Sequence, residues 1–425
     1  MPGSFAPAQA AFAGTLALFA YDAAVAGHVV RQLRRARGER ARARAKPPSI
    51  TVILAAYNEA ANLPAAIARL LNQSDPPDAI LIADDGSIDA TADILATQFG
   101  LNPATADPYP ANAPMTGLCW LRLQHGGKAR AMNLAVARAR SEVVMLLDAD
   151  TLIGRGAVGA MRDAFAHDAD LAVATGILEP MTQNAVGARV MRAFQAHEYR
   201  MTALQSRAWE KDNALQLVAG ACMAISRECF DAVGGFDPDC LAEDYDLAHR
   251  AHLHANRHGL SWKIGVVAGA VVHTEAPATP LALIRQRRRW FGGFLQTHWR
   301  YRGMIGNPRF ARLGTRLMVA KTFDAAQPLL GLATAASLGA ALFAPATPAL
   351  GLVLTAIVAR AVMNGGTALW AERTYRAWTG GEREARAPII VLVGAAEALS
   401  YRLLRHIGEL LGWMTFWRGK VGWRS

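Results

Sequence analysis

Two carboxylates follow a short apolar run in the first half of the chain. The run from Val143 to Leu147 ends in Asp148 and Asp150, which are separated by one residue. A short all-apolar run bounded by polar residues is typical of a strand buried on both faces. Ligands of open α/β sheets bind at the carboxyl ends of such strands. Carboxylate oxygens suit Mg²⁺ or Mn²⁺, and a nucleotide diphosphate would complete the metal's coordination. Taken alone, the pattern also fits a strand followed by an acidic helix start.

Two further predicted strands also end in polar residues. These residues are Tyr57, Asn58 and Glu59 after the strand at residues 49–56, and Asp84 and Asp85 after the strand at residues 79–83. Acidic side chains gathered at one edge of a sheet repel one another and lose hydration, so the cluster is unfavourable without a cation. We therefore favour a cation-dependent nucleotide site over a purely structural role.

Strands and helices alternate along residues 48–150, which predicts a parallel, doubly wound sheet with helices on both faces. Further on, we expect a strand at residues 171–176, a long amphipathic stretch at 186–209 and a helix at 244–254. Gly220 lies in a run of small residues between them. Such a run allows a sugar ring to approach the backbone, or it reflects tight packing.

Basic and apolar segments alternate in a way that is typical of a membrane protein. The chain has 425 residues, a net charge of +11 and 52% hydrophobic residues. Arginines gather at residues 31–44, 285–302 and 373–386, each beside an apolar stretch, as the positive-inside rule describes. Basic patches that bind anionic lipid are a compatible interpretation, and we do not expect a nucleic-acid partner.

Apolar segments long enough to span a bilayer lie near both ends of the chain. They are residues 4–30, 323–344 and 349–371. A fourth segment, at 388–417, is interrupted by Glu397, Arg402, Arg405, His406 and Glu409, and we leave open whether it spans the membrane or lies at its interface. We expect an integral protein of the inner (plasma) membrane with its N-terminus outside. The four cysteines form no CxxC pair, which agrees with a reduced, cytoplasmic catalytic domain.

Five motifs occur in an order that resembles the membrane-bound inverting glycosyltransferases of family 2, which include the cellulose, chitin, hyaluronan and poly-N-acetylglucosamine synthases. They are Tyr57-Asn58-Glu59, Asp84-Asp85 with Lys128, Asp148-Ala149-Asp150, Glu243-Asp244, and Gln286 with Arg289-Trp290. The resemblance covers about residues 48–300. It implies a GT-A-type, Rossmann-like, mostly parallel α/β sheet flanked by transmembrane helices.

The resemblance also implies a domain organisation. It consists of an N-terminal transmembrane helix (1–30), a basic cytoplasmic linker (31–47), a GT-A catalytic domain (48–284), the QxxRW segment with interfacial helices (285–320) and C-terminal transmembrane helices (321–425). We do not expect a carboxy-terminal module that binds a cyclic dinucleotide.

The same resemblance assigns roles to individual residues. Asp244 matches the catalytic base, and Asp148 and Asp150 match the pair that binds Mg²⁺ or Mn²⁺. The residues expected to bind UDP are Ala56, Tyr57, Glu59, Asp84, Asp85, Lys128 and Asp148. The residues expected at the diphosphate and the acceptor are Gly220, Glu243, Gln286, Arg289 and Trp290. Arg287 and Arg288 are interpreted as interfacial charges beside lipid headgroups.

Two departures from the family pattern weaken a specific assignment to cellulose. Ala242 stands where the acceptor-side motif usually has threonine, and Ala219 precedes Gly220 where cellulose synthases have cysteine. We expect a processive synthase that extends a β-linked polysaccharide from a UDP-sugar, with N-acetylglucosamine as the favoured sugar. A non-processive enzyme that glycosylates a membrane lipid is the alternative, and a catalytically inactive export subunit is the third. The few predicted spans leave an export partner or a homo-oligomer open.

Overall fold

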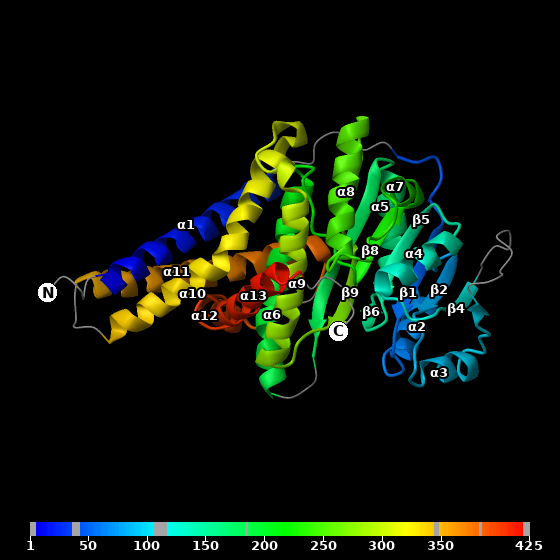
Figure 1. The fold of residues 1–425 in the computed structure, drawn as a ribbon, viewed down its shortest axis with the longest axis horizontal. Coiled ribbons are helices and arrows are strands. Elements are labelled where there is room, and N and C mark those ends of the chain that lie inside the picture. Colours follow the sequence, from blue (N-terminus) through cyan, green and yellow to red (C-terminus); the bar gives the residue numbers. More distant parts are fainter. Residues whose placement is uncertain are drawn as a thin grey trace. The chain divides into compact units, whose positions relative to one another are not determined.

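The computed structural model describes residues 6–35, 43–105, 117–182, 186–343, 348–381 and 385–419. The chain divides into two compact units (Figure 1). Of the described residues, those within 37–181 and 212–275 form the sheet unit, and those within 1–36, 182–211 and 276–420 form the helical unit. Residues 182–211, which we expected inside the catalytic domain, group with the helical unit. The other expected domain boundaries stay a prediction.

Within the described residues, the sheet unit contains a mixed sheet of nine strands in the order β3-β4-β2-β1-β5-β8-β7-β9-β6. The strands are β1 (Ile50–Ala56), β2 (Ala79–Asp84), β3 (Ala104–Thr105), β4 (Gly117–Arg122), β5 (Val143–Asp148), β6 (Thr151–Ile153), β7 (Leu171–Met181), β8 (Cys222–Ser226) and β9 (Lys263–Glu275). Strands β1 to β5 pair in parallel, whereas β8 runs antiparallel to both β5 and β7. The expected α/β class is confirmed, and the antiparallel strands were not foreseen.

The central strand β1 brings the polar strand ends together. It lies between β2 and β5, and their registers place Ala56 beside Asp84 and Ala55 beside Asp148. Because these three strands are parallel, their carboxyl ends lie on one edge of the sheet. The expected convergence of the acidic residues at this edge is therefore confirmed.

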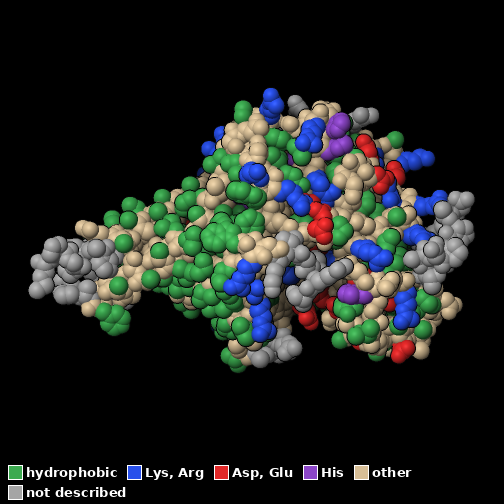
Figure 2. Space-filling view, viewed as in Figure 1, with side chains coloured by type: hydrophobic (Ala, Val, Ile, Leu, Met, Phe, Trp, Pro, Cys, Tyr) green, Lys and Arg blue, Asp and Glu red, His purple; other side chains and the backbone are tan. Residues whose placement is uncertain are grey.

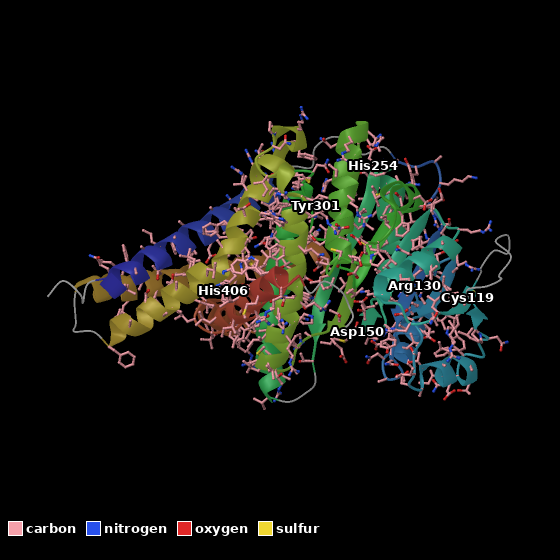
Figure 3. The ribbon with its side chains drawn as sticks, viewed as in Figure 1. Cys119, Arg130, Asp150, His254, Tyr301 and His406 are labelled. Atoms are coloured by element: carbon pink, nitrogen blue, oxygen red, sulfur yellow. The ribbon has the colours of Figure 1, made fainter. Side chains whose placement is uncertain are left out.

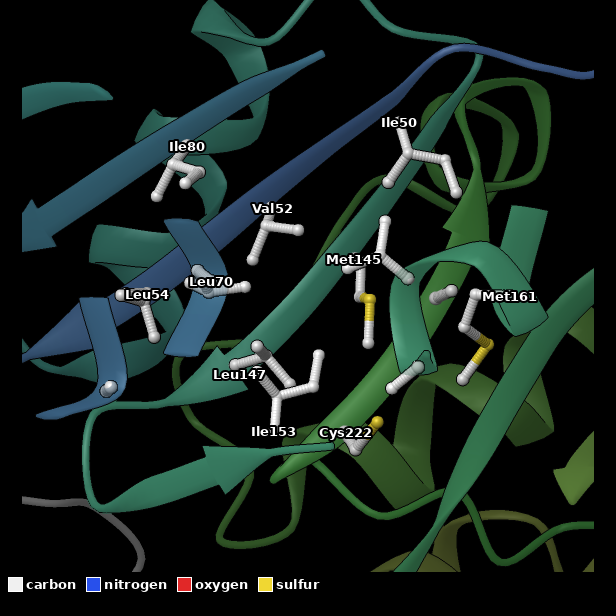
Figure 4. Close-up of a cluster of buried hydrophobic side chains, with 14 of the residues drawn as sticks. Ile50, Val52, Leu54, Leu70, Ile80, Met145, Leu147, Ile153, Met161 and Cys222 are labelled. Carbon is white, nitrogen blue, oxygen red and sulfur yellow. The ribbon is translucent and has the colours of Figure 1, made fainter. Parts of the chain in front are cut away.

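Helices cover both faces of the sheet. They are α2 (Leu63–Leu71), α3 (Thr91–Thr97), α4 (Lys128–Arg138), α5 (Ala157–His167), α7 (Arg227–Val233) and α8 (Glu243–His258). Val52 and Leu54 belong to a buried cluster with Leu70 of α2 and Met161 of α5 (Figure 4). Strand side chains alternate between faces, so Ile53, which is equally buried, points to the opposite face, where α4 contacts β1 and β2.

The helical unit contains seven α-helices within the described residues. They are α1 (Ala6–Arg34), α6 (Val186–Glu210), α9 (Pro280–Arg300), α10 (Val319–Leu342), α11 (Pro348–Thr379), α12 (Ala387–Glu397) and α13 (Tyr401–Trp417). Short helical turns at Arg302–Met304 and Pro308–Phe310 and a π-helical segment at Leu313–Met318 connect α9 to α10. Green hydrophobic side chains are abundant on the part of the surface where Figure 1 shows α1 and α10 (Figure 2).

Two helices in the described part of the chain are long and apolar enough to cross a membrane. They are Gln9–Arg34 and Gly351–Thr379. The pair α12–α13, bent by 42° at its break, would add a third span if the two helices cross the membrane as one. The span expected at 323–344 forms most of α10 but is not among these candidates, and residue 344 lies outside the described residues.

Charged residues within these helices pair with one another across the bundle. Asp22 of α1 lies 2.7 Å from Arg360 of α11 and 2.8 Å from Arg402 of α13. Arg402 also pairs with Glu397 of α12 at 2.8 Å. A charge in an apolar environment is costly unless it is paired. The charges that interrupt the apolar segment at 388–417 are therefore explained by ion pairing inside the bundle.

Candidate active site

Hydrogen bonds of Asn58 fix the conformation of the turn after β1. Asn58 has a positive φ of 57°. Its side-chain oxygen accepts a hydrogen bond from the backbone of Ile88 at 2.9 Å, and its own N–H donates to Ser87 at 3.0 Å. The preceding Tyr57 is exposed and stacks on His125, with ring centroids 4.3 Å apart. The turn thus presents a flat aromatic pair at the polar edge of the sheet.

The two acids after β2 accept hydrogen bonds from neighbouring loops. Asp84 is completely buried, and its oxygens accept bonds from the backbone of Ser87 at 2.8 Å and the indole of Trp120 at 3.3 Å. Asp85 is 3% exposed. Its oxygens accept from the backbones of Gly126 at 2.9 Å and Gly127 at 2.8 Å. These bonds fix the two loops that surround the edge, while the assignment of both acids to UDP binding stays a prediction.

Gly86 allows these two loops to approach each other. Its φ is +76°, a conformation that L side chains rarely adopt, and a Cβ there would lie 2.7 Å from the backbone nitrogen of His125. Sequence reasoning assigned no role to Gly86, which directly follows the Asp84-Asp85 motif, or to the N–H groups that bind Asp85. The Gly-Gly pair that directly precedes Lys128 was the available signal.

Lys128 lies at the centre of an acidic cluster. Its Nζ is 2.5 Å from Oδ1 of Asp148 and 3.7 Å from Oε1 of Glu243. Although burial opposes its charge, the carboxylates of Asp148 and Glu243 outweigh that effect and raise the pKa of Lys128. Lys128 therefore stays protonated and partly neutralises the acids that surround it.

Asp150 and Glu59 carry the uncompensated part of this negative charge. Asp150 lies in the turn between β5 and β6 (Figure 3). Burial, followed by the charges of Asp148 and Glu59, raises the pKa of Asp150 to about 6. Burial likewise raises the pKa of Glu59, and the charges of Glu275 and Asp148 add to the effect. A bound cation would relieve this repulsion.

Asp244 lies in the first turn of α8 and is held by two backbone donors. Its Oδ2 accepts from the N–H of Gly220 and its Oδ1 from the N–H of Tyr245, both at 2.7 Å. Gly220 reaches this position because β8 runs antiparallel to β5, so that Cys222 pairs with Leu147 at the carboxyl end of β5. The structure thus brings Gly220 to Asp244, which lies 24 positions further along the sequence.

Burial raises the pKa of both acids at the start of α8. It raises the pKa of Asp244, although Lys128 and the two backbone donors oppose the shift. It raises the pKa of Glu243 to about 7, with the charge of Asp244 adding to the effect. Groups with raised pKa values near neutrality are suited to proton transfer.

Gln286, Arg289 and Trp290 belong to α9 of the helical unit. Trp290 is 38% exposed, Arg289 is exposed, and the side-chain oxygen of Gln286 is buried without a hydrogen-bond partner. We predicted that these three residues bind the diphosphate and the acceptor. Their position within the helical unit does not test these roles, which stay a prediction.

The interpretation of Arg287 as a lipid-facing charge is wrong. Arg287 is 7% exposed and pairs with Glu198 of α6 at 2.7 Å. Its guanidinium also lies 4.4 Å from the ring centroid of Trp290. Glu198 additionally accepts from the hydroxyl of Tyr401 at 2.7 Å. The partner acid lies 89 residues away, so local sequence could not identify it. Arg287 instead helps to position the tryptophan.

A divalent cation fits the chemistry of Asp148 and Asp150. Both supply carboxylate oxygens, and Asp150 carries a raised pKa that a cation would lower. In the part of the chain that the structure describes, no three His, Cys, Asp or Glu side chains form a group that could hold a metal ion. Two protein ligands leave positions that a diphosphate would fill.

The fold and the acidic residues at the carboxyl edge of its parallel strands agree with an α/β enzyme of the glycosyltransferase type. A family model described as "Glycosyltransferase like family 2" matches residues 47–293. The chain belongs to this family, which confirms both the resemblance inferred from the sequence and the expected class of enzyme.

Two curated relatives are named for different products, one a glycolipid and the other a polysaccharide. The chain is 26% identical over 260 residues to a beta-monoglucosyldiacylglycerol synthase of Synechocystis, covering 60% of this chain and 50% of that protein. It is 27% identical over 246 residues to a poly-beta-1,6-N-acetyl-D-glucosamine synthase of Staphylococcus aureus, covering 57% and 54%. The chain therefore spans about half the length of the curated relatives that it matches.

The fold is shared with a solved structure. A mannosyltransferase of Pyrobaculum calidifontis, solved in complex with GDP-Man and Mn²⁺, matches with a TM-score of 0.61 and 21% identity. The match covers 93% of this chain and 99% of the mannosyltransferase. At this level of identity, the similarity shows the fold alone.

Proposed function

We propose that this protein is a membrane-embedded inverting glycosyltransferase that moves a sugar from a UDP-sugar to a growing β-linked polysaccharide. UDP-N-acetylglucosamine is the favoured donor, because one relative is named as a poly-beta-1,6-N-acetyl-D-glucosamine synthase. The observation that carries the proposal is the position of Asp244. It is held by the backbone of Gly220, in a cluster with Lys128 and Asp148.

Asp244 is the proposed base. In a one-step inverting transfer, a base removes the proton of the acceptor hydroxyl as that oxygen attacks the anomeric carbon. A carboxyl whose pKa is raised toward the working pH holds this proton more readily than an ordinary aspartate. The N–H groups of Gly220 and Tyr245 orient its two oxygens. Trp290 offers a ring against which the acceptor sugar can stack.

Lys128 is the proposed partner of the leaving diphosphate, together with Arg289. Asp148 and Asp150 would hold Mg²⁺ or Mn²⁺, which supplies charge stabilisation for the diphosphate. Lys128 keeps its proton in the cluster, so its positive charge is available at the same place. The stacked pair Tyr57 and His125 and the buried acid Asp85 shape the loops proposed to receive the uridine.

A lipid acceptor is the second candidate. It is favoured by the relative that is named as a beta-monoglucosyldiacylglycerol synthase and by the helices long enough to cross a membrane. In both cases we place the protein in the inner (plasma) membrane with the sheet unit in the cytoplasm. An export partner or a second copy of the chain would complete a path for a polymer.

The test uses the full chain purified in detergent, with Mn²⁺ or Mg²⁺ and a panel of UDP-sugars. A long polymer made from UDP-N-acetylglucosamine and lost in Asp244→Asn supports the synthase. Asp163→Asn, at an exposed position of α5, is the matched control and should retain activity. A single sugar on lipid would replace the synthase with the second candidate. If Asp244→Asn kept full activity, the assignment of the base would be wrong.

A further inference from the structure

Glu198 of α6 joins three helices of the helical unit. Its Oε2 accepts hydrogen bonds from the guanidinium of Arg287 on α9 and from the hydroxyl of Tyr401 on α13, both at 2.7 Å. Its Oε1 lies 3.2 Å from the guanidinium of Arg405, also on α13. Both carboxylate oxygens are therefore occupied by donors, and the function proposed above gives Glu198 no role.

This junction is nearly closed to solvent. The side chains of Glu198 and Arg287 are 13% and 8% exposed, and Tyr401 is buried. The ring of Tyr401 stacks on that of Phe194, with centroids 5.4 Å apart. A charge in such surroundings is costly unless it is paired and hydrogen-bonded, so the carboxylate and its donors keep one arrangement. The junction therefore fixes the position of the Arg287 guanidinium.

Two glycines let α13 pack directly on the backbone of α9. A Cβ at Gly408 would lie 2.8 Å from the carbonyl oxygen of Ile284. A Cβ at Gly412, one turn further along α13, would lie 3.0 Å from the carbonyl oxygen of Arg288. Small residues at this spacing allow two helices to approach closely. The helix that carries Arg287 is therefore held by its backbone as well as by that side chain.

The guanidinium of Arg287 covers one face of Trp290. Its central carbon lies over the indole, 4.4 Å from the ring centroid. A guanidinium is attracted to the face of an aromatic ring, and this contact restricts the rotation of the indole. Trp290 is nevertheless 38% exposed. A sugar can therefore stack on the ring only from the face opposite Arg287, and the position of Arg287 decides where that face points.

We infer that Glu198 is a positioning residue for the acceptor. It holds Arg287 against one face of Trp290, so that the other face is presented to the acceptor sugar. This inference rests on the function proposed above, in which the acceptor stacks on Trp290. Glu198 acts through Arg287 and contributes to acceptor binding. Its effect on the UDP-sugar is small, because the residues proposed to receive the uridine lie in the sheet unit.

The test measures steady-state kinetics of the full chain purified in detergent. The donor is UDP-N-acetylglucosamine, and the acceptor is a β-1,6-linked N-acetylglucosamine oligosaccharide or diacylglycerol, whichever the unmodified protein uses. Glu198→Gln weakens the hold on Arg287 and should raise the KM of the acceptor about tenfold, the effect of losing a guanidinium–indole contact. The KM of the donor should change less than about twofold, which a general structural defect would not produce.

Asp324→Asn is the matched control. Asp324 is a partly buried acid of the same unit, and like Glu198 it has a basic partner, Lys321 at 2.9 Å, and a tyrosine hydroxyl, that of Tyr21. Its replacement should leave the KM of the acceptor unchanged. An equal rise in this control would overturn the inference, because the loss of any buried ion pair would then have the same effect.

A second variant covers the case in which Glu198→Gln does not fold. Arg287→Lys keeps the positive partner of Glu198, but the compact ammonium does not lie flat on the indole as a guanidinium does. It should raise the KM of the acceptor and leave that of the donor nearly unchanged. An equal rise of both KM values, or no rise of either, would overturn the inference.

A double-mutant cycle identifies the ring as the target. In Trp290→Ala the ring is absent, so adding Glu198→Gln or Arg287→Lys should raise the KM of the acceptor no further. Additive effects would mean that the residues act independently, and the inference alone would then be wrong. If the unmodified protein transferred no sugar to either acceptor, the proposed function would fail, and the inference with it.

Discussion

The backbone N–H of Gly220 donates a hydrogen bond to Oδ2 of Asp244 at 2.7 Å. A Cβ at position 220 would lie 3.0 Å from the same oxygen and 3.6 Å from Nζ of Lys128. The absence of a side chain at Gly220 thus sets the position of the proposed base relative to the cluster around Lys128.

We therefore predict that Gly220→Ala lowers sugar transfer by about 10- to 100-fold, because a small displacement of a catalytic group has effects of this size. The measurement is UDP release by the purified variant, with the melting temperature recorded beside it. Gly156→Ala is the control in the same unit, since a Cβ there meets only Ser74, at 4.0 Å. Equal activity of the two variants would contradict the positioning role.

Removal of Lys128 should make the protein more dependent on an added cation. In Lys128→Met, Asp148 and Glu243 lose their positive partner. We expect a loss of stability of about 1–3 kcal/mol and a larger rise in melting temperature on adding Mn²⁺ than in the unmodified protein. Lys263→Met, which removes a more exposed pair with Asp168, is the control. A Mn²⁺ response that stays unchanged in Lys128→Met would refute this prediction.

Glu243 should make stability depend on pH. Burial raises its pKa from 4.5 to about 7, so the fold favours the protonated acid. The protonated carboxyl of Glu243 therefore stabilises the folded protein. This stabilisation is fully present below about pH 4.5 and is lost as the pH rises to 7. Glu243→Gln mimics the protonated acid and lacks this loss. We expect its melting temperature to exceed that of the unmodified protein by a few degrees at pH 8.

This difference should shrink as the pH falls toward 4.5. The measurement is a series of thermal unfolding curves of both proteins between pH 4.5 and 8. If the difference between the two melting temperatures stayed constant from pH 4.5 to 8, the raised pKa of Glu243 would be wrong.

The ion pairs of the helical bundle should dominate its stability. In Arg402→Met, Glu397 loses its partner at 2.8 Å, and Asp22 loses one of the two arginines with which it pairs. Leaving buried carboxylates unpaired costs about 3–5 kcal/mol. Unfolding of the purified protein in detergent measures this cost, and adding Glu397→Gln to the variant should recover part of it. Arg418→Met, exposed at the end of α13, should have no effect. If Arg402→Met left the free energy of unfolding unchanged, the ion pairs would add nothing to stability.

Local patterns in the sequence determined the strands and the acids at their ends. The runs before Ala56, Asp84 and Asp148 form β1, β2 and β5, because short apolar runs are stable only when both of their faces are buried. Parallel pairing then requires the acids to share an edge. The class of enzyme followed from the order of these motifs, and the family match confirms it.

Only the tertiary structure decided which side chains are neighbours. The antiparallel strand β8 places Gly220 against Asp244, and the helical bundle pairs Arg287 with Glu198. Neither contact has a local signal, because hydrogen bonds and ion pairs form between atoms within a few ångströms regardless of their separation along the chain. The burial of a side chain also depends on residues that are distant in the sequence. The sequence contains the carboxyl of Glu243, but only the packing around it raises its pKa to about 7.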